Sequence, residues 1–230
     1  METLIEKYNN LQKQILSEVG LKWKVDEGNP LSREELQDYY YLGKYVNLDI
    51  LHNSIYLIDV GELVKKNFLK FGLEAPSRQA EVGGRYLRLY GLLSAVYQQK
   101  LAVENLLELY KMEEKEKISS GLNSSSLINL CNKLGAHATH FRSNLAGFKN
   151  QFRFYEFSRQ DLENNKIKLL VKKYEFENYD LLEDLKHFNK KVELTLSFMI
   201  SQILKNSFNN QGEYYKQYLG IEKQKDSIST

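Results

Sequence analysis

Apolar residues recur every three to four positions through residues 78–115, and this spacing constrains the fold more than any other feature of the chain. It places a stripe of side chains along one face of a long α-helix on most turns. The stripe comprises Val82, Tyr86, Leu89, Leu93, Val96, Tyr97, Leu101, Leu107 and Leu109. Similar spacing predicts helices over 3–19, 33–71, 126–141 and 179–207. Only two prolines occur in the 230 residues, which suits long helices because proline interrupts their backbone hydrogen bonds.

The spacing changes from helical to alternating in residues 166–176. There Ile167, Leu169 and Val171 lie on one side of an extended chain and lysines lie mostly on the other, which predicts a strand. Residues 152–157 are the predicted partner strand. The predicted fold class is therefore all-α, a helical bundle with a small two-stranded β insertion.

We expect residues 1–230 to form a single helical domain. Within it, residues 1–31 form an N-terminal helix, which ends at Gly20, and a loop. Residues 118–126 are rich in serine and glycine and predict a flexible loop. Residues 208–230 predict a C-terminal tail, in which EYYKQYL docks as a short helix and the last residues fray.

Charge and cysteine content exclude several classes of protein. The chain has 32 Lys and Arg against 30 Asp and Glu, a net charge of +2, so no global field attracts nucleic acid and any such site must be a local patch. The single cysteine, Cys131, has no partner for an internal disulfide, which favours a reducing compartment. No apolar run reaches the roughly 18–20 residues of a membrane span, and the start, METLIEKYNN, lacks the pattern of a signal peptide. We expect a cytoplasmic protein without membrane contact.

The segment CNKLGAHATHFRSN places polar side chains on a helix that is otherwise apolar. Lys133 and His137 are four residues apart and share a face of this helix. Asn132 and His140 lie beside that face. A histidine exchanges a proton near neutral pH, an amide can orient it, and Lys133 or Arg142 can balance the charge of a phosphate. Cleavage of RNA through its 2′-hydroxyl needs little more and requires no metal.

Simpler explanations apply to the same residues. A histidine on an apolar face, as at His137, is commonly a core residue with satisfied hydrogen bonds, and a lone lysine such as Lys133 is commonly solvated. His137 and His140 form an H-x-x-H pair, but no carboxylate or thiolate follows at tight ligand spacing. The sequence therefore predicts no metal and no cofactor.

The segment CNKLGAHATH resembles the part of HEPN-superfamily proteins that carries an R-N-x(3–5)-H type motif in a helix, with Asn132 and His137 at matching positions. The order of elements over residues 33–207 is similar in outline. The resemblance implies a helical bundle that is commonly a homodimer, in which two protomers form one composite site. It also implies a metal-independent endoribonuclease of the kind found in toxin–antitoxin, phage-defence and RNA-processing systems.

Cys131 stands where that family has arginine. A thiol does not supply a planar, bidentate cation, and loss of one such electrostatic donor typically costs about 2.7–4 kcal/mol. Cys131 is either a nucleophile or, more simply, a small buried residue. The resemblance thus implies an RNA-directed protein with a weakened ribonuclease activity. The alternative is a non-catalytic dimeric module that binds a protein partner, such as an antitoxin or a defence component. The predicted catalytic residues are His137 and Asn132, and the predicted RNA-binding residues are Lys133, His140 and Arg142.

Two other groups of residues each have more than one explanation. Asp59 and Glu62 are either a carboxylate pair or part of a solvated helix face, and the solvated face is the common case. A third alternative is that Glu62 and Glu104 frame a polar pocket beside His137. The glycines Gly83, Gly84 and Gly91 allow either a phosphate to approach the backbone or two helices to pack closely, and packing is the simpler explanation.

A basic strip with interleaved aromatic residues surrounds the predicted strand. The basic residues are Arg153, Arg159, Lys166, Lys168, Lys172 and Lys173. The aromatic residues are Phe152, Phe154, Tyr155, Phe157, Tyr174 and Phe176. This composition suits single-stranded RNA, whose bases stack on aromatic rings. The favoured alternative is that the rings pack on the bundle and the lysines protect an exposed strand edge.

Overall fold

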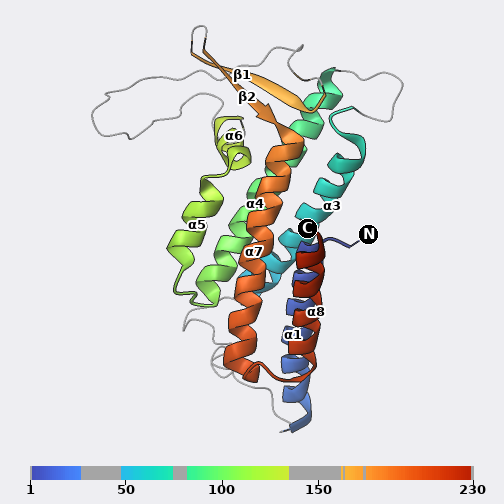
Figure 1. Cartoon of the computed structure of the whole chain (residues 1–230), viewed down its shortest axis with the longest axis vertical. Helices are drawn as coiled ribbons and strands as arrows, with labels where there is room; N and C mark the ends of the chain where they lie inside the picture. The colour runs from blue at the N-terminus through green and yellow to red at the C-terminus, as the bar shows by residue number, and fades with distance from the viewer. Residues whose placement is uncertain are drawn as a thin grey trace, which may run out of the picture. The chain divides into compact units, whose positions relative to one another are not determined.

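The computed structural model of the chain describes residues 2–26, 48–74, 82–134, 162, 164–172 and 175–228. In chain order the elements are α1 (Leu4–Asp26), α3 (Leu48–Phe71), α4 (Val82–Leu109), α5 (Lys115–Asn123), α6 (Ser126–Leu134), β1 (Lys166–Lys172), β2 (Glu175–Asp180), α7 (Leu181–Phe208) and α8 (Gly212–Ile228). Figure 1 shows helices throughout, with one small ribbon of two strands. The predicted fold class, all-α with a small two-stranded β insertion, is confirmed.

The chain divides into two compact units, each assembled from separate segments of sequence. The first unit comprises Met1–Glu62, Gln98–Ser120 and Asn189–Thr230, and the second comprises Leu63–Tyr97 and Gly121–Phe188. The helices α3, α4 and α7 each contribute residues to both units. The single domain expected over residues 1–230 therefore corresponds to these two units, which we describe separately.

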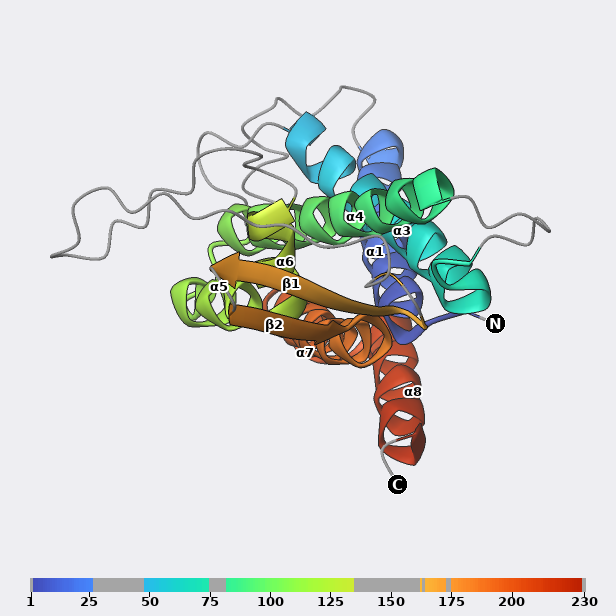
Figure 2. The ribbon, with the colours of Figure 1, turned by 90° about the horizontal axis from the view of Figure 1, so that it is seen from above.

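The first unit has a core of apolar side chains from α1, α3, α4 and α7. Helical spacing brings them to one side of each helix, as the sequence predicts. The fully buried members include Ile5, Tyr8, Leu11, Leu51, Ile58, Val103, Leu106, Leu196 and Ile200. In the same unit α8 lies beside α1 and runs in the opposite direction (Figures 1 and 2).

The second unit contains α6, the ribbon and the adjoining ends of the long helices. β1 pairs with β2 in antiparallel register, with Ile167 opposite Tyr179 and Leu169 opposite Glu177. Ile167, Leu169 and Tyr179 are buried, so one face of the ribbon packs on the unit, because side chains alternate along a strand. β2 contacts α6 on this side (Figure 2).

The strand predicted over residues 166–176 is thus divided, with β1 ending at Lys172 and β2 beginning at Glu175. The sequence between them lacks the Asn-Gly or Gly-containing pair that usually marks a tight hairpin, so the spacing gave no sign of a break. Residues 152–157, the predicted partner strand, lie outside the described residues.

The structure also differs from the predictions near both ends of the chain. α1 continues past Gly20 to Asp26, because one glycine weakens a helix interior by only about 1 kcal/mol. A capping box starts this helix: the Glu6 carboxylate accepts from the Thr3 backbone N–H at 2.7 Å, and Thr3 Oγ1 accepts from the Glu6 N–H at 3.1 Å. The expected tail of residues 208–230 instead forms α8 over Gly212–Ile228, held to other helices through Glu222.

The loop expected over residues 118–126 is mostly helical. α5 covers Lys115–Asn123, and the Ile118 N–H donates to the Glu114 carbonyl oxygen at 3.0 Å. Leu122 is fully buried, and this burial stabilises the helix more than its serines and Gly121 weaken it.

Candidate functional site

The helix α6 carries the described part of the predicted RNA site, namely Cys131, Asn132 and Lys133. The remaining predicted site residues, His137, His140 and Arg142, lie outside the described residues. The first turn of α6 is formed, since the Asn129 N–H donates to the Ser125 carbonyl oxygen at 3.0 Å. Leu127, Leu130 and Leu134 are buried, so the apolar face predicted from the spacing packs on the second unit.

Cys131 also faces the core. Its side chain is 3% exposed, and the thiol donates to the carbonyl oxygen of Leu93 on α4 with 3.3 Å between sulfur and oxygen. Burial raises the pKa of the Cys131 thiol to about 12, so the thiolate that a nucleophile requires does not form near neutral pH. The position is therefore that of a small buried residue, and an arginine placed here would point into the unit.

Asn132 is the predicted catalytic residue that the structure describes, and it lies at the boundary of the buried face. Its side chain is half-buried. Successive residues of an α-helix are rotated by about 100° around its axis, so Asn132 turns away from the direction taken by Cys131. Asn132 is therefore partly exposed, and its catalytic role stays a prediction.

Lys133 contacts the inner face of the ribbon. Its ammonium group forms an ion pair with Glu177 and donates to the Tyr179 hydroxyl at 3.1 Å. The ammonium also lies 5.8 Å from the centre of the Tyr179 ring. Glu177 and Tyr179 are two apart on β2 and so project to the same face, and the Tyr179 hydroxyl donates to Glu177 at 2.6 Å. The Lys133 side chain is only 11% exposed, and through these contacts it joins α6 to β2.

The opposite face of the ribbon carries part of the predicted basic strip. Lys166 and Lys168 on β1 are exposed, and so is Phe176 on β2. The Lys168 ammonium lies 4.4 Å from the centre of the Phe176 ring. Phe176 is therefore not packed against the bundle, contrary to the alternative explanation for the aromatic residues. The side chain of Lys172 and the strip residues Phe152, Arg153, Phe154, Tyr155, Phe157, Arg159, Lys173 and Tyr174 lie outside what the structure describes.

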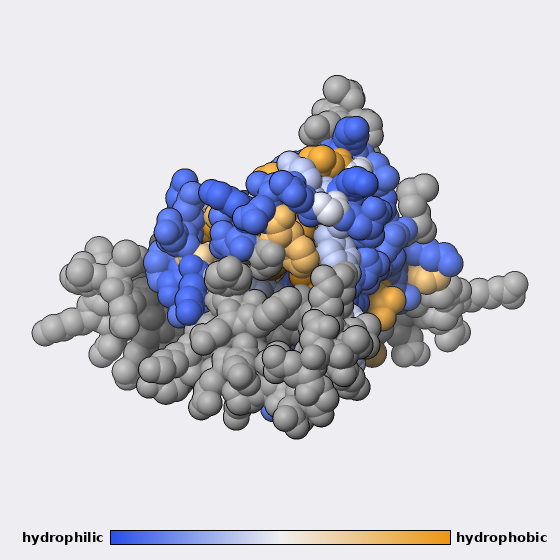
Figure 3. Space-filling model, turned by 90° about the horizontal axis from the view of Figure 1, so that it is seen from below, coloured by the Kyte–Doolittle hydropathy of each residue, from blue (hydrophilic) through white to orange (hydrophobic). Residues whose placement is uncertain are grey.

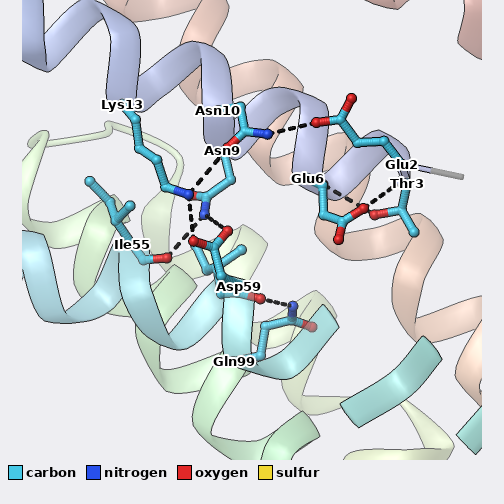
Figure 4. Close-up of polar contacts among 10 residues, drawn as sticks. Glu2, Thr3, Glu6, Asn9, Asn10, Lys13, Ile55, Asp59 and Gln99 are labelled. Atoms are coloured by element: carbon cyan, nitrogen blue, oxygen red, sulfur yellow. Dashed lines mark hydrogen bonds and ion pairs between the residues drawn. The ribbon is translucent and has the colours of Figure 1, made fainter. Parts of the chain in front are cut away.

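A buried polar seam joins α1 to α3 in the first unit (Figure 4). The Asn9 amide is fully buried and donates to the Ile55 carbonyl oxygen at 3.0 Å and to the Asp59 carboxylate at 2.7 Å. Lys13 forms an ion pair with the same carboxylate. Asp59 thus serves to join two helices.

Glu62 is buried, whereas its spacing from Asp59 suggested a solvated face. Thr3 Oγ1 donates to its carboxylate at 2.7 Å, and Gln99 Nε2 donates to it at 2.9 Å. Gln99 also donates to the Ile58 carbonyl oxygen at 3.1 Å. The solvated interpretation is wrong because partners on α4 and before α1 replace water around the carboxylate.

A second polar cluster joins α8 to the rest of the first unit. Tyr8 is fully buried and its hydroxyl donates to Glu222. Ser197 Oγ donates to the same carboxylate at 2.6 Å and lies 3.3 Å from the Tyr218 hydroxyl, while Lys225 pairs with Glu222 at 2.8 Å. Burial, followed by the bond to Glu222, raises the pKa of Tyr8 far above its usual range. The buried phenol is therefore a donor at all ordinary pH values.

Beside this cluster, a groove of about 570 Å³ runs between α1 and α8. The residues that line it include Lys7, Asn10, Gln14, Gln217 and Gln224. Lys7 donates to Gln224 across it. The groove is thus an open surface feature along two packed helices. From the end where α4 turns toward α5, the coloured surface is mainly hydrophilic with small apolar patches (Figure 3).

Within the described residues, no helix packs closely against Gly83, Gly84 or Gly91 of α4. A Cβ atom added at any of these glycines would meet no described atom within 4 Å, so the described residues do not support the packing explanation. The nearby arginines are engaged within the second unit. Arg85 pairs with Glu74 at 3.0 Å, and Arg88 Nε donates to the Gly72 carbonyl oxygen at 2.8 Å. Arg88 therefore supplies a hydrogen-bond donor to the carbonyl oxygen that directly follows α3.

In the described ranges, no three His, Cys, Asp or Glu side chains gather closely enough to hold a metal ion. None of the helices that the structure describes combines the length and apolar character needed to cross a membrane. Comparison of the chain with family models, curated proteins and solved structures found no match.

Proposed function

We propose that the chain is a HEPN-like, RNA-directed protein with at most weak, metal-independent ribonuclease activity, acting in the cytoplasm in a toxin–antitoxin or phage-defence type system. The observation that carries the proposal is the contrast between two neighbours on α6. Asn132 is partly exposed, whereas Cys131, at the position where the resembling family has arginine, is buried against Leu93.

This contrast separates RNA binding from RNA cleavage. Binding needs polar groups that RNA can reach, and we infer that the partly exposed Asn132 and the exposed lysines of β1 supply them. Rapid cleavage also needs a fixed cation at the phosphate in the transition state. Lys133 is a poor replacement because Glu177 and Tyr179 hold its ammonium group against the ribbon. We therefore expect binding to survive where catalysis is weak.

The test incubates purified protein with mixed RNA in EDTA and measures both cleavage and binding. We expect tight binding with slow or absent cleavage, binding weakened by Asn132→Ala, and any slow cleavage abolished by His137→Ala. Asn53→Ala is the matched control, since Asn53 is an exposed asparagine on α3. Absence of RNA binding would overturn the proposal, and so would rapid cleavage.

Restoring the family's arginine is not an equivalent test. Cys131→Arg introduces a charged side chain at a buried position, and burial of an unpaired charge strongly destabilises a fold. We expect this variant to lose stability and to gain no activity.

A second candidate function is a non-catalytic homodimeric module that binds a protein partner. Leu87 on α4 favours it, because this side chain is 75% exposed and large exposed apolar groups often belong to interfaces. Light scattering tests the dimer. This candidate requires a dimer that Leu87→Glu converts to monomer, and a monomeric wild type would exclude it.

A further inference from the structure

The outer face of the β1–β2 ribbon has an unusual composition for a solvated surface. Strand alternation and the pairing of Lys166 with Asp180, Lys168 with Asn178 and Leu170 with Phe176 define which side chains share this face. Its members are Lys166, Lys168, Leu170, Phe176, Asn178 and Asp180. An aromatic ring, an amide and two ammonium groups therefore lie together on one small sheet.

Phe176 is the central feature of this face. The core of the second unit takes Ile167, Leu169 and Tyr179 from the inner face, and the Phe176 ring remains 49% exposed. The ring lies diagonally across the strands from Lys168, whose ammonium covers one of its faces at 4.4 Å. A half-exposed ring beside a cation is a surface on which a flat, electron-rich group can stack.

The two lysines of this face are available to an anion. Within the described part of the chain, Lys168 has no carboxylate at ion-pair distance, and its ammonium group lies over the Phe176 ring. Lys166 lies 3.8 Å from Asp180, and these side chains are 70% and 45% exposed. Such an exposed pair is weak, so a phosphate can compete for the Lys166 ammonium. Asp180 lies opposite Lys166, away from Phe176.

We infer that the outer face of the ribbon binds single-stranded RNA. A base stacks on Phe176, Lys168 moves from the ring to a neighbouring phosphate, and Lys166 contacts the next phosphate along the strand. Asn178, directly opposite Lys168, presents its amide to the edge of the stacked base. The inference rests on the proposed RNA-directed function and gives it a second contact surface, away from α6.

The geometry favours a single strand over other acidic partners. In duplex RNA the bases are stacked within the helix and offer no free face to Phe176. An acidic peptide without aromatic residues would use the two lysines but would leave the Phe176 ring without a partner. An unpaired nucleotide uses the ring and the ammonium groups at once.

The test measures the fluorescence anisotropy of a labelled oligouridine in EDTA with the full chain. Phe176→Ala should weaken binding by about tenfold or more, the usual effect of removing one stacking ring, and Phe176→Leu should not restore it. A plot of log affinity against log salt concentration has a negative slope. Lys168→Ala should make this slope less steep by about 0.7, as expected for one lost phosphate contact on a single strand. The matched controls are Leu182→Ala, an exposed apolar side chain, and Lys117→Ala, an exposed lysine.

Three results would overturn the inference: unchanged affinity in Phe176→Ala, equal competition by duplex RNA, or equal competition by polyglutamate. Circular dichroism checks that each variant is folded. If Asn132→Ala weakens binding and Phe176→Ala does not, the proposed function stands and the ribbon surface is excluded. The reverse result supports the ribbon and excludes the α6 site, whereas a wild type that binds no RNA excludes both.

Discussion

The Tyr8 hydroxyl on α1 donates a hydrogen bond to the Glu222 carboxylate on α8, although 214 positions separate the two residues in sequence. Ser197 and Lys225 donate to the same carboxylate at 2.6 Å and 2.8 Å. Burial alone would raise the pKa of Glu222, but the donors Lys225, Ser197 and Tyr8 outweigh it and the pKa is lowered. The ionised carboxylate therefore holds the C-terminal helix in place.

This arrangement predicts how stability depends on acid. Because the pKa of Glu222 is lower in the folded protein, its contribution is complete above the ordinary value of 4.5. It is lost as the pH falls below that value through the folded pKa. Glu222→Gln should lower Tm at pH 7, and the gap to wild type should narrow at about pH 3. Thermal unfolding across this range measures the gap.

The control for this experiment is Glu213→Gln, since Glu213 is an exposed glutamate on the same helix. It should change Tm little at either pH. A gap between wild type and Glu222→Gln that stays constant from pH 7 to acid would contradict the role given to the carboxylate.

Cys131 should be chemically silent in the folded protein. Its thiol is buried and burial raises its pKa to about 12, so both access and the thiolate are lacking. A thiol reagent such as Ellman's reagent should react at pH 8 only as the protein unfolds in urea. Free glutathione in the same solution provides the reference rate, and rapid reaction of the native protein would show that position 131 is open.

The contact between Lys133 and Glu177 should stabilise the second unit modestly. Their side chains are 11% and 40% exposed, so solvent partly screens the pair. A double-mutant cycle with Lys133→Met and Glu177→Gln should give a coupling free energy of about 1 kcal/mol in urea unfolding. High salt should reduce this coupling. A coupling near zero would mean that the ion pair does not help to hold α6 against β2.

Local spacing was sufficient to predict the long helices and their buried faces, as for Ile5, Tyr8 and Leu11 on α1, but it predicted a loop where α5 lies. It was not sufficient for side chains whose environment comes from distant residues. Glu62 appeared solvated because its partners Thr3 and Gln99 are 59 and 37 positions away. Periodicity reports which face of an element is apolar, and it does not report which polar groups meet across a packed interface.

The same limit applied to the candidate site. The resemblance singled out Cys131 and Lys133 by type and spacing, but their roles depend on groups outside the motif. The Leu93 carbonyl oxygen lies 38 positions from Cys131, and Glu177 lies 44 positions from Lys133. Phe176 carried a usable signal, because it follows a lysine-rich stretch of the sequence, but only the strand register shows which face it occupies.

Two glycines provide a final prediction in which the same substitution has opposite effects. A Cβ atom at Gly61 would lie 2.9 Å from Gln99 Nε2, which donates to the Ile58 carbonyl oxygen and to Glu62. Gly61→Ala should displace this amide and disturb two buried hydrogen bonds, each worth about 1 kcal/mol. That loss exceeds the gain of about 1 kcal/mol in helix propensity, so the free energy of unfolding should fall.

At Gly91, no described atom lies within 4 Å of an added Cβ. Gly91→Ala therefore keeps the gain in propensity and should raise the free energy of unfolding by about 0.5–1 kcal/mol. Urea midpoints measured side by side give the two signs directly, and Gly61→Ala combined with Gln99→Ala shows whether the clash is the cause. If alanine stabilises the protein equally at both positions, the Gln99 side chain can shift without loss of stability. Its hydrogen bonds to Glu62 and Ile58 would then contribute little to the fold.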